Sequence, residues 1–280
     1  MIRNENRLQP TWRANRIWYP AVLLLLAAIS FIGTIYLFQK KPEPRKPVDY
    51  RYAKVKAPNG VQLHLIRTLP RNIDLKAITS NVTDTGEYGI NGGFFWEGSL
   101  LSIAVVNDKP LKGAAGDYGS GWYNIDNSKG TLVWDEAAGT FSVQVAEDPD
   151  GLTVTDRSRY WAQGGISMKL GDDAGWYAQA LEEGLPAIDE KRMRSGLVYD
   201  RDGYLWMIVT PTKSTGEQFR TAVKETLVNA QPVDGVFLDG DGSSQLKVAE
   251  ASLPGDRREV YQMLAIVNRS EDFPGKAALP

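Results

Sequence analysis

Residues 236–246, "VFLDGDGSSQL", combine side chains that could do chemistry with a turn that would expose them. The apolar run at 236–238 predicts the end of a buried strand, because turn-forming residues follow it. Asp239 would stand where the chain leaves the sheet. Glycines on both sides of Asp241 would let backbone N–H groups approach a ligand. The same letters are also typical of an ordinary Asp/Gly/Ser turn, so both interpretations are open.

The residue types in the chain limit the chemistry that such a site could use. There are no cysteines, which excludes thiolate nucleophiles and disulfides, and there is one histidine, His64. A single histidine excludes most zinc hydrolase sites within one chain. His64 lies between apolar neighbours in a predicted strand, and we interpret it as a structural or surface residue. No G-x-S-x-G nucleophile elbow is present. If the chain is an enzyme, carboxylates are the favoured catalysts.

Metal and nucleic-acid sites are not favoured. Asp239, Asp241 and Ser243 alternate along the chain and could hold a hard cation, but the longer ligand series of a calcium loop is missing. We therefore predict no metal and no cofactor. The 32 basic and 34 acidic residues nearly cancel, to a net charge of −2. Because no basic field results, we expect no nucleic-acid partner.

Two further glycine-rich segments carry polar side chains. Residues 89–98, "GINGGFFWEG", and residues 161–175, "WAQGGISMKLGDDAG", each admit two interpretations. They could be glycine bulges that lead into an aromatic core. Alternatively, they could form the base of a binding site, where the backbone approaches a ligand and aromatic rings stack on a sugar. A third segment, "KRMRSG" at 191–196, places Arg192 and Arg194 just before a predicted hairpin, where they would bind phosphate or carboxylate if they faced a site.

The elements that must position these segments are mostly strands. The patterns predict hairpins at 131–147 and 195–210, a strand with one wet face at 61–68, and a further strand at 260–269. One helix is predicted at 215–230, with Thr215 and Gln218 as a capping box. Strands outnumber helices, so the expected class is α+β on a mixed or antiparallel sheet.

The N-terminal part predicts a membrane anchor. Residues 18–38 form 21 residues without a charge, long enough for a helix to cross a bilayer. A buried core helix and a cleaved signal peptide fit this composition less well. Basic residues stand on both sides of the span, so charge does not set its orientation. We expect a short tail at 1–17, a proline-containing charged linker at 39–49 and a globular domain at 50–280.

The order of the segments, "NGGFF", "AQGGISMKLGD", "RSGLVYDRDG" and "VFLDGDGSS", resembles the phosphodiester glycosidase family from about Val61 to Arg269. Two positions depart from the family pattern, which has a glycine at Asp241 and a proline at Ile166. The resemblance implies hydrolysis of a bond between an anomeric carbon and a phosphodiester oxygen, through an oxocarbenium-like state.

The resemblance also implies roles for particular residues. Asp239 is the expected catalytic carboxylate, which either stabilises the cationic sugar or activates water. Glu97 and Asp241 are reserve carboxylates, and Arg194 is the expected phosphate partner. The expected substrate-binding residues are Asn91, Gly92, Gly93, Gln163, Gly164, Gly240, Asp241, Ser243 and Ser244.

We therefore expect a membrane-anchored hydrolase that acts on a sugar phosphodiester or a related cell-envelope glycan, with its soluble domain outside the cytoplasm. A non-catalytic glycan-binding or exopolysaccharide and envelope-assembly protein on the same fold is the alternative. A purely structural anchor would leave the glycine-flanked polar residues unexplained.

Overall fold

The computed structural model describes residues 22–30 and 49–268. The chain divides into two compact units, Met1–Arg45 and Lys46–Pro280. In the first unit, residues 22–30 are helical and fall inside the predicted span. Within the described ranges, no helix is long and apolar enough to cross a membrane. Most of segments 1–17, 18–38 and 39–49 lies outside the described residues, so the anchor and linker stay predictions.

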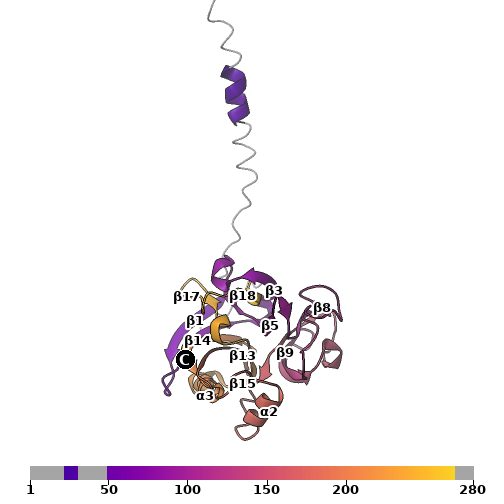
Figure 1. The fold of residues 1–280 in the computed structure, drawn as a ribbon, viewed down its shortest axis with the longest axis vertical. Helices are drawn as coiled ribbons and strands as arrows, with labels where there is room; N and C mark the ends of the chain where they lie inside the picture. Colours follow the sequence, from indigo (N-terminus) through magenta and orange to yellow (C-terminus); the bar gives the residue numbers. More distant parts are fainter. Residues whose placement is uncertain (1–21, 31–48, 269–280) are drawn as a thin grey trace, which may run out of the picture. The chain divides into compact units, whose positions relative to one another are not determined.

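A six-stranded antiparallel sheet forms the centre of the second unit (Figure 1). The predicted 195–210 hairpin lies in its middle and is confirmed. The strand that leads to Asp239 pairs with this hairpin on one side and with a short strand on the other. In spatial order the strands are β1 (Tyr50–Lys56), β2 (Gln62–Thr68), β14 (Leu205–Ser214), β13 (Arg192–Asp200), β15 (Pro232–Phe237) and β12 (Ile166–Ser167).

Two five-stranded sheets and one small hairpin complete the unit, and all pairs between named strands are antiparallel. The first contains the predicted 131–147 hairpin, in the order β10 (Thr140–Ala146), β9 (Lys129–Asp135), β11 (Tyr160–Gly164), β7 (Ala104–Val106) and β8 (Lys109–Pro110). The second has the order β17 (Ser252–Leu253), β16 (Leu246–Lys247), β4 (Gly89–Asn91), β18 (Val260–Ile266) and β3 (Ile73–Ser80). The small hairpin is β5 (Phe95–Trp96) with β6 (Ser99–Leu100).

Two helices accompany these sheets, α2 (Trp176–Glu182) and α3 (Gly216–Thr226). The capping box of α3 is confirmed: the Thr215 hydroxyl accepts from Gln218 N at 3.1 Å, and Gln218 Oε1 accepts from Thr215 N at 3.1 Å. The helix ends before the predicted residue 230, because 228–230 tightens into a 3-10 turn and Gln231 is left-handed, with φ 51°. The sequence patterns had not predicted α2. Together the elements confirm an α+β class built on antiparallel sheet.

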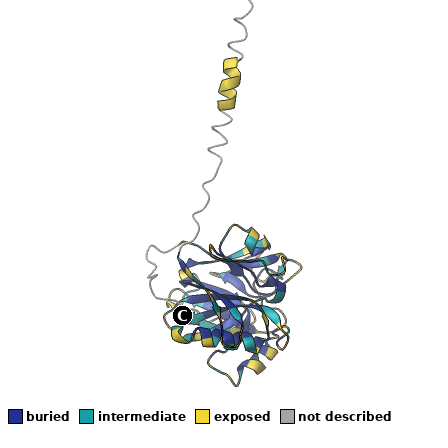
Figure 2. Cartoon of the chain, turned by 90° about the vertical axis from the view of Figure 1, so that its left-hand side faces the viewer, coloured by how far each residue is buried: buried dark blue, intermediate teal, exposed yellow. Residues whose placement is uncertain are grey.

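Strand β2 and the inner strands of the central sheet are buried on both faces, which corrects the expectation of a wet face at 61–68. Side chains alternate along a strand, and β14 sends Trp206 and Ile208 to one hydrophobic cluster but Met207 and Val209 to the other. Figure 2 shows this buried interior in dark blue. Full burial of one such side chain contributes roughly 1.5–3 kcal/mol, so the strands around the site have a rigid base.

His64, on β2, is a structural residue, as expected. It is 4% exposed, and its ring nitrogens lie 2.8 Å from the Tyr52 hydroxyl and 3.1 Å from Gln62 Nε2. Burial lowers the pKa of His64, with a smaller effect from Lys54. The neutral ring therefore helps to pair β1 with β2, because both of its nitrogens are engaged in hydrogen bonds with side chains of these strands.

Candidate active site

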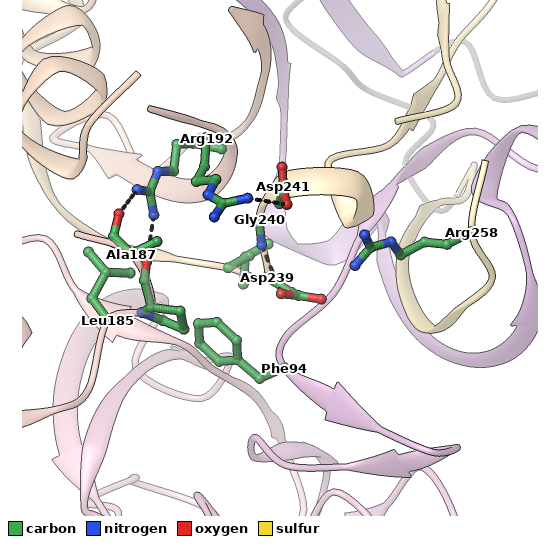
Figure 3. Close-up of a pocket in the computed structure, with 11 residues that line it drawn as sticks. Phe94, Leu185, Ala187, Arg192, Asp239, Gly240, Asp241 and Arg258 are labelled. Carbon is green, nitrogen blue, oxygen red and sulfur yellow. Dashed lines mark hydrogen bonds and ion pairs between the residues drawn. The ribbon is translucent and has the colours of Figure 1, made fainter. Parts of the chain in front are cut away.

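A pocket of about 280 Å³ opens where β15 ends, beside the start of β13 (Figure 3). It is lined by the loop after β15, the first residues of β13, the loop after α2, and single residues from two other loops. Its lining residues are Phe94, Leu185, Pro186, Ala187, Arg192, Arg194, Leu238, Asp239, Gly240, Asp241 and Arg258.

Asp239 stands where the strand leaves the sheet, as the sequence predicted. Its backbone is held on both sides, because its N–H donates to Gly92 O at 3.4 Å and its carbonyl accepts from Asn91 Nδ2 at 2.9 Å. Its half-buried carboxylate accepts from Gly240 N at 2.9 Å. The strand end therefore presents this carboxylate to the pocket with a fixed backbone.

Burial raises the pKa of Asp239 to about 6. The Ser243 hydroxyl, the Gly240 N–H and the positive charge of Arg258 oppose this rise, and the charge of Asp241 adds to it. A carboxyl with this pKa is ionised at neutral pH but exchanges its proton close to it, which suits acid–base work.

Asn91 positions the Asp239 loop from inside the protein. Besides the Asp239 carbonyl, its Nδ2 donates to Gly92 O at 3.1 Å, while its Oδ1 accepts from the Ser195 hydroxyl at 2.9 Å and from Gln245 N at 3.1 Å. Asn91 is 1% exposed and does not line the pocket. Its amide is thus saturated, and its contribution to the site runs through Asp239.

Gly92, Gly93, Gln163 and Gly164 also lie in the interior, away from the pocket lining. A Cβ on Gly92 would stand 2.5 Å from the Gln262 side chain, and one on Gly164 would stand 2.6 Å from Ile103 N. Gln163 is fully buried and exchanges hydrogen bonds with Gln262. Close neighbours on β18 (Gln262) and on the segment before β7 (Ser102 and Ile103) explain these glycines without a ligand.

Arg194 lines the pocket, but its guanidinium is engaged elsewhere. It donates to four backbone carbonyls: Ser214 O at 3.3 Å, Pro186 O at 3.0 Å, Glu190 O at 3.1 Å, and Ala187 O. These bonds take four of the five N–H groups of a guanidinium. Burial lowers the pKa of Arg194. Arg194 therefore anchors the 186–190 loop that forms one pocket wall, and one N–H remains for a ligand.

Arg192 is the more exposed of the two arginines, and two acids hold it. Its Nη1 lies 3.1 Å from Asp241 Oδ2, and its Nη2 lies 2.7 Å from Glu190 Oε2. Asp241 adopts the left-handed backbone, with φ 51°. Glycine adopts this conformation freely and aspartate more readily than most residues, which accounts for a loop that takes either residue at this position.

The paired serines lie in the interior and do not line the pocket. Ser243 and Ser244 are both buried; the Ser243 hydroxyl lowers the pKa of Asp239, and the Ser244 Oγ makes no hydrogen bond within the part of the chain that the structure describes. Their backbone N–H groups close a 3-10 turn onto Gly240 O at 3.1 Å and Asp241 O at 3.0 Å. The serines shape the loop, and neither is among the lining residues.

Glu97 is not brought to the pocket. It is exposed, with φ 45°, in the turn that joins β5 to β6, and it does not line the cavity. Its reserve catalytic role therefore has no geometric support. Within the described ranges, no group of three or more His, Asp or Glu side chains could hold a metal ion.

Sequence patterns missed Arg258, the loop residues 185–187 and the place of Phe94 in the lining. Arg258 binds Asp256, with both carboxylate oxygens 3.0 Å from its Nε and Oδ2 2.5 Å from its Nη2. Figure 3 shows Arg258 approaching Asp239 from the side opposite Arg192. No motif marks Arg258. It reaches the pocket because its loop packs on the 239–244 loop, with Asp256 N donating to Gly242 O at 3.2 Å.

The chain matches no protein-family model and no curated protein. Among solved structures, it is similar to the catalytic domain of zebrafish N-acetylglucosamine-1-phosphodiester alpha-N-acetylglucosaminidase, auto-inhibited by its pro-peptide. The TM-score is 0.53 at 14% identity, over 82% of this chain and 85% of that chain.

Two other structures align at 14% identity with lower TM-scores. A hypothetical protein from Synechocystis gives 0.41, over 78% of this chain and 61% of that one. A putative exported protein from Burkholderia pseudomallei gives 0.33, over 79% and 58%. At these identities the zebrafish likeness concerns the fold: this chain has a distant phosphodiester glycosidase-like fold.

Proposed function

We propose that this chain is a hydrolase that cleaves the bond between a sugar and a phosphodiester group. The observation that carries the proposal is Asp239, a carboxyl with its pKa raised to about 6, in a pocket that also contains three arginines. The similarity of the fold to a domain named for hydrolysis of a sugar-1-phosphodiester supports the same class of reaction.

Asp239 is the group proposed to act at the sugar. Its carboxylate either stabilises the positive charge that develops at the anomeric carbon or activates the attacking water. The leaving group is a phosphate monoester, whose second pKa of about 6 lets it depart with less help from a general acid than an alcohol needs. Phe94 offers the sugar an apolar ring face at the pocket wall.

The phosphate is proposed to bind Arg258 and Arg192 rather than Arg194 alone. Their recorded bonds use two N–H groups of Arg258 and three of Arg192, which leaves three and two of the five for a ligand. Guanidinium groups bind phosphate oxygens in pairs and stay charged at any working pH. Arg194 supports the wall behind them through its four carbonyl bonds.

The reaction is tested with the full chain, an N-acetylglucosamine-1-phosphate methyl ester and an aryl N-acetylglucosaminide. We expect sugar release from the phosphodiester. Because Asp239 acts as a carboxylate, kcat/KM should fall about tenfold for each pH unit below about 6, the pKa of this group, and level off above it. A rate that rises as the pH falls through 6 would contradict this role. Saturable binding without any turnover would favour the glycan-binding alternative.

Residues 18–38 are proposed to anchor the chain in a membrane, with residues 50–280 outside the cytoplasm. The support is the uncharged 21-residue span, and the location follows from an envelope glycan as substrate. A reporter that functions only outside the cytoplasm should be active when fused to the C-terminus. Activity of a cytoplasmic reporter at the same fusion point would reverse the topology.

A further inference from the structure

Asp241 places a second carboxylate in the pocket, close to the groups that would bind a phosphate. It lines the cavity, and its Oδ2 lies 3.1 Å from Arg192 Nη1. Figure 3 shows this ion pair, which joins Arg192 at the start of β13 to the loop that carries both Asp239 and Asp241. The negative charges of Asp241 and Asp239 also act on Arg258. Any anion that binds Arg192 or Arg258 therefore meets the charge of Asp241.

The backbone fixes Asp241 at this position. Its φ of 51° and the turn closed by Ser244 N on its carbonyl, at 3.0 Å, belong to the 3-10 turn after Gly240. On the other side of the ion pair, Glu190 holds Arg192 through Nε at 3.2 Å and Nη2 at 2.7 Å. Arg192 is thus held between two acids, of which only Asp241 lines the pocket.

A fixed negative charge discriminates between anions by their charge. A phosphodiester carries one negative charge, whereas a phosphate monoester carries close to two above its second pKa of about 6. Repulsion by a carboxylate a few ångströms away is therefore about twice as large for the monoester. The arginines attract the dianion more strongly in the same proportion, so the carboxylate of Asp241 reduces the preference for the dianion that the arginines alone would give.

We propose that Asp241 is a specificity-determining residue that shifts the selectivity of the pocket towards phosphodiesters and away from phosphate monoesters. This inference rests on the proposed function, because it takes the pocket as the place where the phosphate binds. The residue disfavours the dianionic monoester, which is also the product that must leave after hydrolysis. The selection belongs to the electrostatics of binding and needs no turnover to be observed.

The test compares methyl phosphate with dimethyl phosphate, which differ by one ionisable group, in NMR titrations of the full chain at about pH 7.5, where the monoester is mostly dianionic. Asp241→Asn keeps the size of the side chain and removes its charge. We expect methyl phosphate to bind about tenfold more tightly to the variant, and dimethyl phosphate about threefold or less. Adding Arg192→Gln to this variant should remove most of both gains.

The matched control is Glu190→Gln, which also loosens Arg192 but leaves the pocket carboxylate in place. Because Glu190 does not line the pocket, this variant should change the ratio of the two affinities clearly less than Asp241→Asn does. Equal gains for both probes with Asp241→Asn would overturn the inference, as would failure of the wild type and the variant to bind either probe. Because neither probe tests hydrolysis, the selectivity can appear in a chain that cleaves no sugar phosphodiester. Conversely, turnover with an unchanged selectivity would reject the role of Asp241 alone.

Discussion

The 239–244 loop and the glycine-rich segments of β4 and β11 look alike in the sequence but lie in different surroundings. Both place small residues beside polar side chains. In the loop, the carboxylates of Asp239 and Asp241 line a pocket. In β4 and β11, the amides of Asn91 and Gln163 are buried and bound to backbone and to Gln262. The glycines in the first region expose a site, whereas those in the second let strands approach each other.

Two of the three arginines that line the pocket, Arg194 and Arg258, differ in the same way. Arg194 directs its guanidinium into a loop and binds four carbonyls, while Arg258 keeps most of its N–H groups for the pocket. Proximity to a pocket therefore does not distinguish a group that binds a ligand from one that holds the wall. The number of donors already engaged does.

The largest expected effect comes from Asp239→Asn. The change keeps the shape and removes the charge, so kcat/KM should fall by about a thousandfold or more if Asp239 is the catalytic carboxylate. Asp234→Asn, on the strand β15 that leads to Asp239 but outside the pocket lining, is the control for activity and should keep most of it. Near-wild-type turnover of Asp239→Asn would mean that Asp239 is only a turn residue.

The stability of Asp239→Asn sharpens this result. Because the folded pKa is raised to about 6, the stabilising contribution of the protonated group is complete below the unfolded value and is lost as the pH rises through 6. The free energy of unfolding of the Asn variant at about pH 7.5 should therefore equal that of the wild type or exceed it by at most about 3 kcal/mol, and this gain should shrink towards pH 4. Thermal unfolding at both pH values measures the difference.

Substitution of the pocket arginines Arg258 and Arg194 should give the next largest effect on activity. Arg258→Gln should lower kcat/KM on the sugar phosphodiester by about 30- to 100-fold, because a charge-assisted contact in a partly buried pocket is lost. It should affect an aryl glycoside of the same sugar much less. Arg194→Lys should lower both rates by the same factor and reduce the free energy of unfolding by about 1–3 kcal/mol, since several carbonyls lose their donor. A selective loss on the phosphodiester with Arg194→Lys would restore the phosphate role expected from the sequence.

The smallest effect on activity, and a clear one on stability, is expected from the interior glycines. Gly164→Ala would place its Cβ 2.4 Å from Asn124 Oδ1 and 2.6 Å from Ile103 N, so the free energy of unfolding should fall by about 1–3 kcal/mol. Gly240→Ala meets its nearest neighbour, Met193 O, at 3.0 Å and should destabilise less while changing the pocket. Chemical denaturation of both variants checks the order. A Gly164→Ala variant that folds normally but loses substrate affinity would place β11 in the site.

Local patterns in the sequence determined the elements and the exit point of the candidate carboxylate. The apolar run before Asp239, the capping box of Thr215 and Gln218, and the 195–210 hairpin depend on neighbours within a few residues, and the structure has all three. The antiparallel α+β class follows from the same local signals. The departure at 61–68 arose because burial on both faces of β2 depends on what covers the sheet.

Only the tertiary structure decided which polar groups meet. Arg258 reaches the pocket through a loop that follows β17 and precedes β18, and nothing in its local sequence marks it. Arg194 could be assigned to the wall only once the carbonyls of Pro186, Ala187, Glu190 and Ser214 were in place around it. The physical reason is that propensity and periodicity act along the chain. Saturation of hydrogen-bond donors, the raised pKa of Asp239 and the ion pair of Asp241 depend on residues brought together from distant positions.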